Sequence, residues 1–155
     1  MRNAERGLNR RTFMAAAIGL GAAAVGVPNG EAAETSALEQ ANIQLAKDFC
    51  AAWPGHDLDR ILAFFADNGS YRMTETMEPT KGRDALIARL KMIINNVTQF
   101  EILDTWARGP MVMNERIDRF VNFPLKSWHG VGVFLVKNGK IVEWYDYTIE
   151  SERTV

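Results

Sequence analysis

The chain has only one cysteine and two histidines among its 155 residues, and this scarcity argues against several kinds of site. Cys50 has no second cysteine with which to form an intrachain disulfide, and we expect it to be an inert, buried thiol on the apolar side of a helix. His56 and His129 lie far apart, without the paired spacing of a zinc site. We therefore predict neither a disulfide scaffold nor a metal centre, and no motif demands a cofactor.

The chain also lacks an apolar run long enough for a stable transmembrane span. The run over residues 15–27 is short and rich in Ala and Gly. It follows the twin arginines Arg10 and Arg11, and Pro28 and small residues come after it. This is the pattern of a bacterial twin-arginine (Tat) export signal. We predict a signal peptide over residues 1–32, cleaved at or next to its last residue, and export to the periplasm or the exterior.

The remainder, residues 33–155, is long enough to bury a core as one compact domain. The whole chain has 18 basic and 19 acidic side chains; removing the four arginines and two glutamates of the signal leaves 14 and 17, a net charge of −3. A mildly acidic domain without a basic stripe is a poor candidate for binding nucleic acid.

The first half of this domain has helical periodicity. Ser36 and Glu39 have the spacing of a capping box, which predicts that a helix starts at residue 37. Its apolar stripe is expected at Leu38, Ala41, Leu45, Phe49 and Ala52. A second helix is expected after Asp57, with Phe65 on its apolar stripe. A short strand is then expected over residues 70–74, and a third helix over residues 83–94.

The second half changes to long strands. These are expected over residues 97–108, 111–122, 126–136 and 140–150. Asn138 and Gly139 form a strong hairpin signal at the last joint, and Gly130 and Gly132 within one strand would ease a bend or a bulge. Four long antiparallel strands after three helices indicate an α+β domain with the helices on one face of a bent sheet.

Two of these strands carry carboxylates among large apolar residues. Strand alternation places Arg116 and Asp118 on one face, and Asp146 on the same face as Trp144. On an apolar face, desolvation raises the pKa of a carboxyl group, whereas a neighbouring cation such as Arg116 favours its charged form. Two carboxylates around one guanidinium could therefore divide the work, one as a base and the other as an acid.

Alternation does not decide which face of this strand is buried. Met111, Met113 and Ile117 occupy the opposite face and could equally form the core side. An Arg-x-Asp pair on a strand is commonly a solvated, weak ion pair. If the methionine face is exposed instead, it supplies an apolar patch through which we expect a homodimer to form.

The order and spacing of residues 114–120, 132–134, 138–141 and 144–147 resemble the limonene-1,2-epoxide hydrolase family. That family belongs to the superfamily of cone-shaped domains that includes nuclear transport factor 2, SnoaL-like proteins and ketosteroid isomerase. The resemblance spans about residues 36–150. It implies a curved mixed or antiparallel sheet forming a cone, with three N-terminal helices on its concave face and a pocket for a small apolar ligand. We expect the tryptophans in the core or the pocket wall, at Trp106, Trp128 and Trp144.

In the family that this chain resembles, a water molecule attacks the epoxide carbon directly, without a covalent enzyme intermediate. The resemblance implies that Asp146 is the base, Asp118 the acid and Arg116 the bridge between them. It also implies that Tyr71 helps to hold the water. The family has a water-binding Asn two residues after that tyrosine, where this chain has Met73.

The missing Asn keeps other functions open. Thr74 follows Met73, but in a regular strand its side chain faces away from the Tyr71 side. We predict a cofactor-independent epoxide hydrolase acting on a small apolar epoxide. The alternatives are an enzyme like ketosteroid isomerase or polyketide cyclase, and a non-catalytic binding domain for a terpenoid or steroid-like ligand. Arg116 weighs against the isomerase, because a fixed cation depresses the pKa of an adjacent base.

Overall fold

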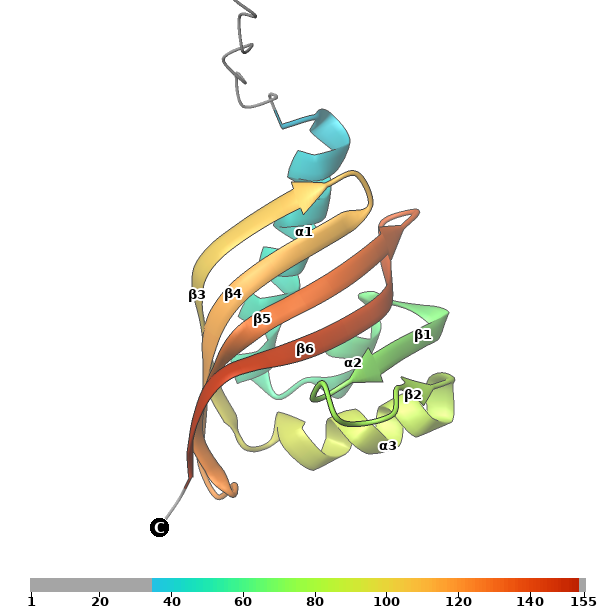
Figure 1. Cartoon of the computed structure of the whole chain (residues 1–155). Helices are drawn as coiled ribbons and strands as arrows, with labels where there is room; N and C mark the ends of the chain where they lie inside the picture. The colour runs from blue at the N-terminus through green and yellow to red at the C-terminus, as the bar shows by residue number, and fades with distance from the viewer. Residues whose placement is uncertain (1–34, 154–155) are drawn as a thin grey trace, which may run out of the picture. The chain divides into compact units, whose positions relative to one another are not determined.

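The computed structural model describes residues 35–153, and within them the fold is α+β (Figure 1). The predicted signal over residues 1–32 lies outside the described residues. The elements, in chain order, are α1 Ala37–Ala52, the 3-10 helix η1 Trp53–Gly55, α2 Leu58–Leu62, β1 Phe65–Arg72, β2 Thr80–Lys81, α3 Arg83–Ile94, β3 Val97–Arg108, β4 Met111–Phe120, β5 Leu125–Lys137 and β6 Lys140–Arg153.

The six strands form one mixed sheet in the order β2-β1-β6-β5-β4-β3. Strands β3 to β6 pair antiparallel with their chain neighbours, β1 pairs parallel with β6, and β2 pairs antiparallel with β1. The sheet is open, because β2 and β3 are its two edges. It curves strongly, and the helices lie on one side of it, where α1 packs against β3 and β4 and α3 packs against β1 (Figure 1).

The core lies between the helices and the sheet and is rich in aromatic rings. Phe49 of α1 stands at its centre, and its ring makes edge contacts with several other rings at centroid distances of 5.0 to 5.8 Å. These neighbours are Trp53, Phe64, Phe65, Phe134 and Trp144. Aromatic pairs in this geometry add to the stabilisation that their burial supplies.

Helix α1 begins as predicted, and Phe49 and Ala52 of its expected stripe are buried, but its first turns bury a different face. Ser36 and Glu39 form the capping box. The carboxylate of Glu39 also accepts from the backbone N–H of Gly109 at 2.7 Å, and the amide of Asn42 donates to the Gly109 carbonyl at 3.0 Å. Because these two bonds hold the β3–β4 turn, Glu39 and Asn42 are buried, whereas Leu38, expected on the apolar stripe, is exposed.

The four long strands and α3 are confirmed, with small differences at the strand ends. The prediction of a strand over residues 70–74 is wrong at both ends. Phe65 begins the strand instead of extending the α2 stripe, and Asn68 and Gly69 lie inside the strand, at an irregularity in its pairing with β6. The strand also ends at Arg72, so Thr74 is not part of it. The short strand β2 was not expected.

Candidate active site

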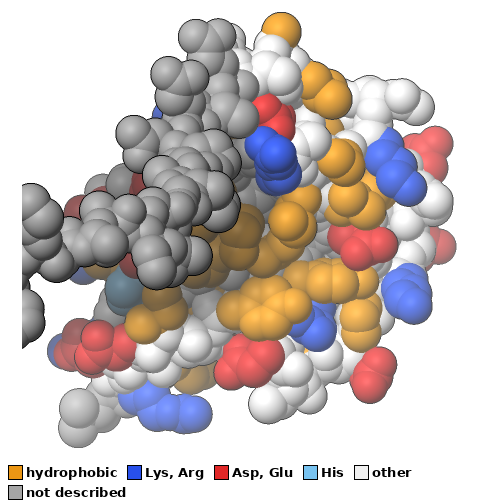
Figure 2. Space-filling model, turned by 45° about the horizontal axis from the view of Figure 1, so that its top comes forward, with side chains coloured by type: hydrophobic (Ala, Val, Ile, Leu, Met, Phe, Trp, Pro, Cys, Tyr) orange, Lys and Arg blue, Asp and Glu red, His pale blue; other side chains and the backbone are white. Residues whose placement is uncertain are grey.

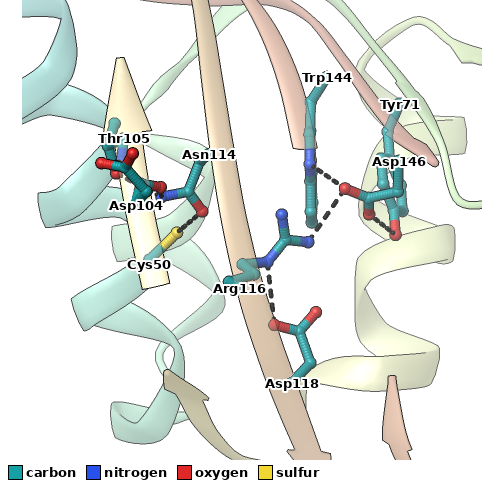
Figure 3. Close-up of polar contacts among 9 residues, drawn as sticks. All are labelled: Cys50, Tyr71, Asp104, Thr105, Asn114, Arg116, Asp118, Trp144 and Asp146. Carbon is teal, nitrogen blue, oxygen red and sulfur yellow. Dashed lines mark hydrogen bonds and ion pairs between the residues drawn. The ribbon is translucent and has the colours of Figure 1, made fainter. Parts of the chain in front are cut away.

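The buried face of β4 is the one that carries the charged residues. Along this strand Val112, Asn114, Arg116 and Asp118 are buried, while the alternate residues are more exposed. Asp146 on β6 and Tyr71 on β1 are also buried on this side. The structure therefore brings together Arg116, Asp118, Asp146 and Tyr71, the four residues that the sequence predicts for the site (Figure 3).

Arg116 lies between the two carboxylates (Figure 3). Its Nε atom is 2.9 Å from Oδ1 of Asp118, and its Nη2 atom is 3.0 Å from Oδ1 of Asp146. The Arg116 side chain is 0% exposed. Burial acts to lower the pKa of Arg116, but the charges of Asp118 and Asp146 outweigh it and raise that pKa above its usual value. Arg116 is therefore a permanent cation.

Aromatic rings surround the guanidinium group. Its central carbon lies 4.9 Å from the ring centroids of Phe100 and Trp128 and 5.5 Å from that of Trp144. Ring faces attract a cation, so they partly compensate for its lost hydration. Gly132 leaves the room that Arg116 needs, because a Cβ atom there would come within 2.3 Å of Nη1.

Asp146 has more hydrogen-bond donors than Asp118. Its Oδ1 atom accepts from Arg116 and from Trp144 Nε1 at 2.8 Å, and its Oδ2 atom accepts from the Tyr71 hydroxyl at 3.3 Å. Burial raises the pKa of Asp146 above its usual value, although Arg116 and these donors act in the opposite direction. Burial and the charge of Asp146 raise the pKa of Tyr71 well above its usual value, so Tyr71 stays protonated and can donate.

Asp118 has fewer hydrogen-bond donors than Asp146. Among the described residues it accepts a hydrogen bond only from Arg116. Burial raises the pKa of Asp118 to about 7, with Arg116 opposing and Asp146 reinforcing the increase. A cluster of one guanidinium and two carboxyl groups is neutral when it holds a single proton, which is the favoured state in a dry environment. The additional donors on Asp146 favour its ionised form, whereas Asp118 has the fewer contacts that oppose protonation.

The cluster lies at an apolar pocket with about 470 Å³ of empty space, part of it open to solvent. Tyr71, Asp118 and Asp146 supply polar atoms to its wall. The rest of the wall is mainly apolar and consists of Met73, Ile93, Val97, Phe100, Phe120, Phe123, Leu125, Trp128 and Trp144, together with Thr74. Such a pocket suits an apolar molecule that has one reactive polar group.

Behind the cluster, Asn114 connects β4 to its neighbours (Figure 3). Its Nδ2 atom donates to the Thr105 hydroxyl at 2.7 Å, and its Oδ1 atom accepts from the Cys50 thiol at 3.5 Å. Burial raises the pKa of Cys50 to about 12, so the thiol is neutral. This confirms the prediction that Cys50 is buried, and its role here is to satisfy a polar group.

The two histidines lie away from the pocket wall. His129 Nε2 is 2.9 Å from Glu115 on the other face of the sheet, and His56 Nδ1 is 2.7 Å from the Ile94 carbonyl oxygen. Within residues 35–153 no group of three or more His, Cys, Asp or Glu side chains is arranged to hold a metal ion. Trp106 is 41% exposed, so the expectation that it belongs to the core or the pocket wall is wrong.

Sequence reasoning missed part of the surroundings of Arg116. Phe100 and Trp128 lie opposite Asp118 on the two neighbouring strands. Their place depends on the strand register, for which the sequence has no direct signal. The Trp144 hydrogen bond to Asp146 did have a signal, since residues two apart on a strand share a face.

An open curved sheet backed by helices, with a polar cluster in an apolar pocket, defines a domain like that of nuclear transport factor 2. The model of the SnoaL-like domain family matches residues 46–144, and the chain belongs to that family. No curated protein sequence matches the chain significantly. Among the described residues, no helix is both long and apolar enough to cross a membrane.

Solved structures of several enzymes resemble this chain. An LEH-like epoxide hydrolase from M. tuberculosis is 29% identical, with a TM-score of 0.58 over 71% of this chain and 84% of that one. SalBIII, an epoxide hydrolase/cyclase-like enzyme of pyran ring formation in the polyether salinomycin, is 19% identical. The TM-score is 0.65, and the match covers 70% of this chain and 91% of SalBIII. A candidate polyketide cyclase from Xanthomonas campestris pv. campestris is 21% identical. The TM-score is 0.61, and the match covers 70% of this chain and 90% of the cyclase chain.

Proposed function

We propose that this protein is an epoxide hydrolase that adds water in one step to a small apolar epoxide. The observation that carries the proposal is the pair of buried carboxylates joined by Arg116 at an apolar pocket. The 29% identity to an epoxide hydrolase adds to it. The pocket wall supports a substrate that is mostly hydrocarbon.

Asp146 is the base in this proposal. Its Oδ1 atom already accepts two hydrogen bonds, from Arg116 and Trp144, whereas Oδ2 accepts one long bond from Tyr71. A water molecule bound at Oδ2 gives its proton to Asp146 as its oxygen attacks an epoxide carbon. Tyr71 keeps Oδ2 oriented toward the pocket that both residues line.

Asp118 is the acid. As the water oxygen forms its bond to carbon, the bond from that carbon to the epoxide oxygen breaks, and Asp118 gives its proton to this oxygen. The product is a diol. The cluster holds one proton before and after the step, first on Asp118 and then on Asp146, so Arg116 keeps one ionised partner throughout. Return of the proton to Asp118 resets the enzyme.

A proton-transfer enzyme without hydrolysis is the second candidate. Met73 stands where the epoxide hydrolases have a water-binding Asn, and a candidate polyketide cyclase is among the similar structures. Asp146 and Asp118 could move a proton on a ketone in the same pocket. Arg116 favours hydrolysis, because a base that must take a proton from carbon loses strength beside a fixed cation.

The test is incubation of the purified protein with cyclohexene oxide, styrene oxide and a terpene epoxide in water enriched in heavy oxygen. We expect a diol that carries the label in the first turnover, because the attacking oxygen comes directly from water. An unlabelled first-turnover diol would indicate a covalent carboxylate ester instead. If no epoxide yields a diol while ketone substrates exchange protons with deuterated water, the second candidate is correct.

A further inference from the structure

The segment that follows β1 lies at the pocket, and what it contributes there rests on the proposed function. Strand β1 ends at Arg72, and residues 73 and 74 form a bend. The strict alternation of a strand therefore does not apply beyond Arg72, and both Met73 and Thr74 line the pocket with Tyr71 and Asp146. The sequence argument that Thr74 faces away does not hold in this structure.

The attacking water needs a second partner besides Asp146. Water has two protons, and if both are held by acceptors, a lone pair is free to point at the epoxide carbon. Met73 cannot serve well, because a thioether sulfur is a weak acceptor and this side chain packs against the core. The pocket must supply another acceptor if the water is to be aligned.

Tyr71 and Asp118 also line the pocket, but the Tyr71 hydroxyl donates to Asp146 and Asp118 is the acid, so Thr74 is the further polar side chain in the described pocket wall that can accept a proton from water. The N–H of Trp144 donates to Asp146, and the N–H of Trp128 donates to the Thr148 hydroxyl at 3.0 Å. The hydroxyl oxygens of Thr74 and Thr76 lie 3.2 Å apart and share a hydrogen bond. A hydroxyl has one proton and two lone pairs, so Thr74 can donate to Thr76 and still accept a proton from water.

The segment that carries Thr74 is attached to β6 by Glu75. The last residue pair of β1 with β6 is Arg72 with Tyr145, so the edge of β6 is uncovered beyond that point. The Glu75 carboxylate accepts from the backbone N–H of Thr148 on this edge at 3.2 Å. Backbone N–H groups, including that of Thr148, hold the pKa of Glu75 below its usual value, which keeps this acceptor charged.

We propose that Thr74 binds the attacking water and takes the place of the missing amide, and that Glu75 positions it by holding residues 73–79 against β6. The water then gives one proton to Asp146 and directs the other to Thr74. Thr74 is a catalytic residue in this proposal, since it touches the reacting water. Glu75 is a positioning residue, since it acts through Thr74.

The test compares Thr74→Val with Thr74→Ser, using cyclohexene oxide and styrene oxide. Valine keeps the shape of threonine and removes the hydroxyl, so we expect kcat to fall at least about tenfold with KM within about twofold of the parent value. Serine keeps the hydroxyl and should retain most of kcat. The inference is wrong if Thr74→Val keeps full kcat, or if serine and valine are equally impaired.

A second pair of variants tests Glu75 in the same assay. Glu75→Ala should lower kcat several-fold, and Glu75→Gln should restore it, because its amide oxygen still accepts from Thr148. The matched control is Glu78→Ala on the same segment, which removes the same charge. Equal activity of Glu75→Ala and the control would remove Glu75 from the proposal. A parent protein that hydrolyses no epoxide overturns the proposed function as well, whereas an active parent with an active Thr74→Val overturns only this inference.

Discussion

Asp118 and Asp146 have different tasks in the proposed reaction, and each can be tested by removing only its ability to transfer a proton. We predict that Asp118→Asn and Asp146→Asn each lower kcat by about 10³-fold, because general acid or base catalysis commonly contributes 10²- to 10⁴-fold. Each variant leaves one carboxylate to pair with Arg116, so folding should be preserved. Steady-state kinetics and thermal unfolding measure the two effects. Near-normal kcat in either variant would contradict the two-carboxylate mechanism.

The protonation of Asp118 also predicts a pH dependence. The acid must carry its proton, and burial raises the pKa of Asp118 to about 7. We expect kcat/KM to fall as pH rises through this region, by about tenfold per pH unit at higher pH, because ever fewer molecules hold the proton. A pH–rate profile of the parent protein measures this, with Glu78→Gln as a control that should have the same profile. Activity that is constant from pH 6 to about 9 would exclude Asp118 as the acid.

At the residue scale, alternation predicted correctly that Arg116 and Asp118 share a face and that Asp146 lies beside Trp144. It could not show that this face is the buried one, because the opposite face of the strand carries Met113 and Ile117, which are also apolar. Burial depends on where α1 and α3 pack, which is a long-range property. The position of Thr74 in the pocket wall had no local signal, since the end of β1 at Arg72 has no breaker residue to mark it.

At the element scale, β5 shows why two glycines occur in one strand. A bend or a bulge was expected at Gly130 and Gly132, and a bulge is found at Gly130, where the register with β6 shifts. A Cβ atom at Gly130 would also lie 2.4 Å from the Tyr147 carbonyl oxygen, so larger residues are excluded there. Gly132 has another purpose, because it makes room for Arg116. No local pattern in the sequence of β5 predicts that Arg116 needs a glycine at this position, because the need arises only when β4 and β5 pair.

We predict that Gly132→Ala displaces the guanidinium of Arg116 and impairs both activity and stability. The added methyl group would meet Nη1 at 2.3 Å and Oδ1 of Asp146 at 3.2 Å. Overpacking of this kind typically destabilises by about 1–3 kcal/mol, and kcat should fall at least about tenfold because the two carboxylates lose their bridge. Urea unfolding and kinetics measure these effects. Gly55→Ala is the control, since a Cβ atom there meets nothing within 4 Å.

Helix α1 illustrates a limit of periodicity at the same scale. Its start and capping box are confirmed, but the expected stripe placed Leu38 inside and left out Glu39 and Asn42. Those two polar residues are buried because they bind the backbone at Gly109. Hydrophobic periodicity detects only the burial of apolar side chains. Where a helix buries polar side chains that bind a turn, the buried face predicted from periodicity is therefore shifted by about one residue along the helix.

At the scale of the whole molecule, the outer face of the sheet carries an apolar band. Trp106, Met113, Val133 and Tyr145 lie opposite one another on β3, β4, β5 and β6. Figure 2 shows hydrophobic side chains gathered together on the face that it presents, with charged ones around them. We propose that two copies of the chain form a homodimer through this band. We predict that the Met113→Glu variant is a monomer, with the molar mass measured by light scattering. The control Leu38→Glu changes an exposed residue of α1 and should leave the dimer intact. A monomeric parent protein would refute the proposal.

The twin arginines predict where the whole molecule acts. Tat export carries proteins that are already folded, and this domain can fold in a reducing compartment because its single cysteine forms no intrachain disulfide. We predict that replacing both Arg10 and Arg11 by Lys abolishes export in a bacterium with a Tat system and leaves folded protein in the cytoplasm. Cell fractionation measures this, with Arg6→Lys as the charge-matched control. Export of the double variant, or of the parent chain in a Tat-deficient strain, would show that the arginines are not an export signal. In the proposed function, an exported hydrolase would meet epoxides before they enter the cell.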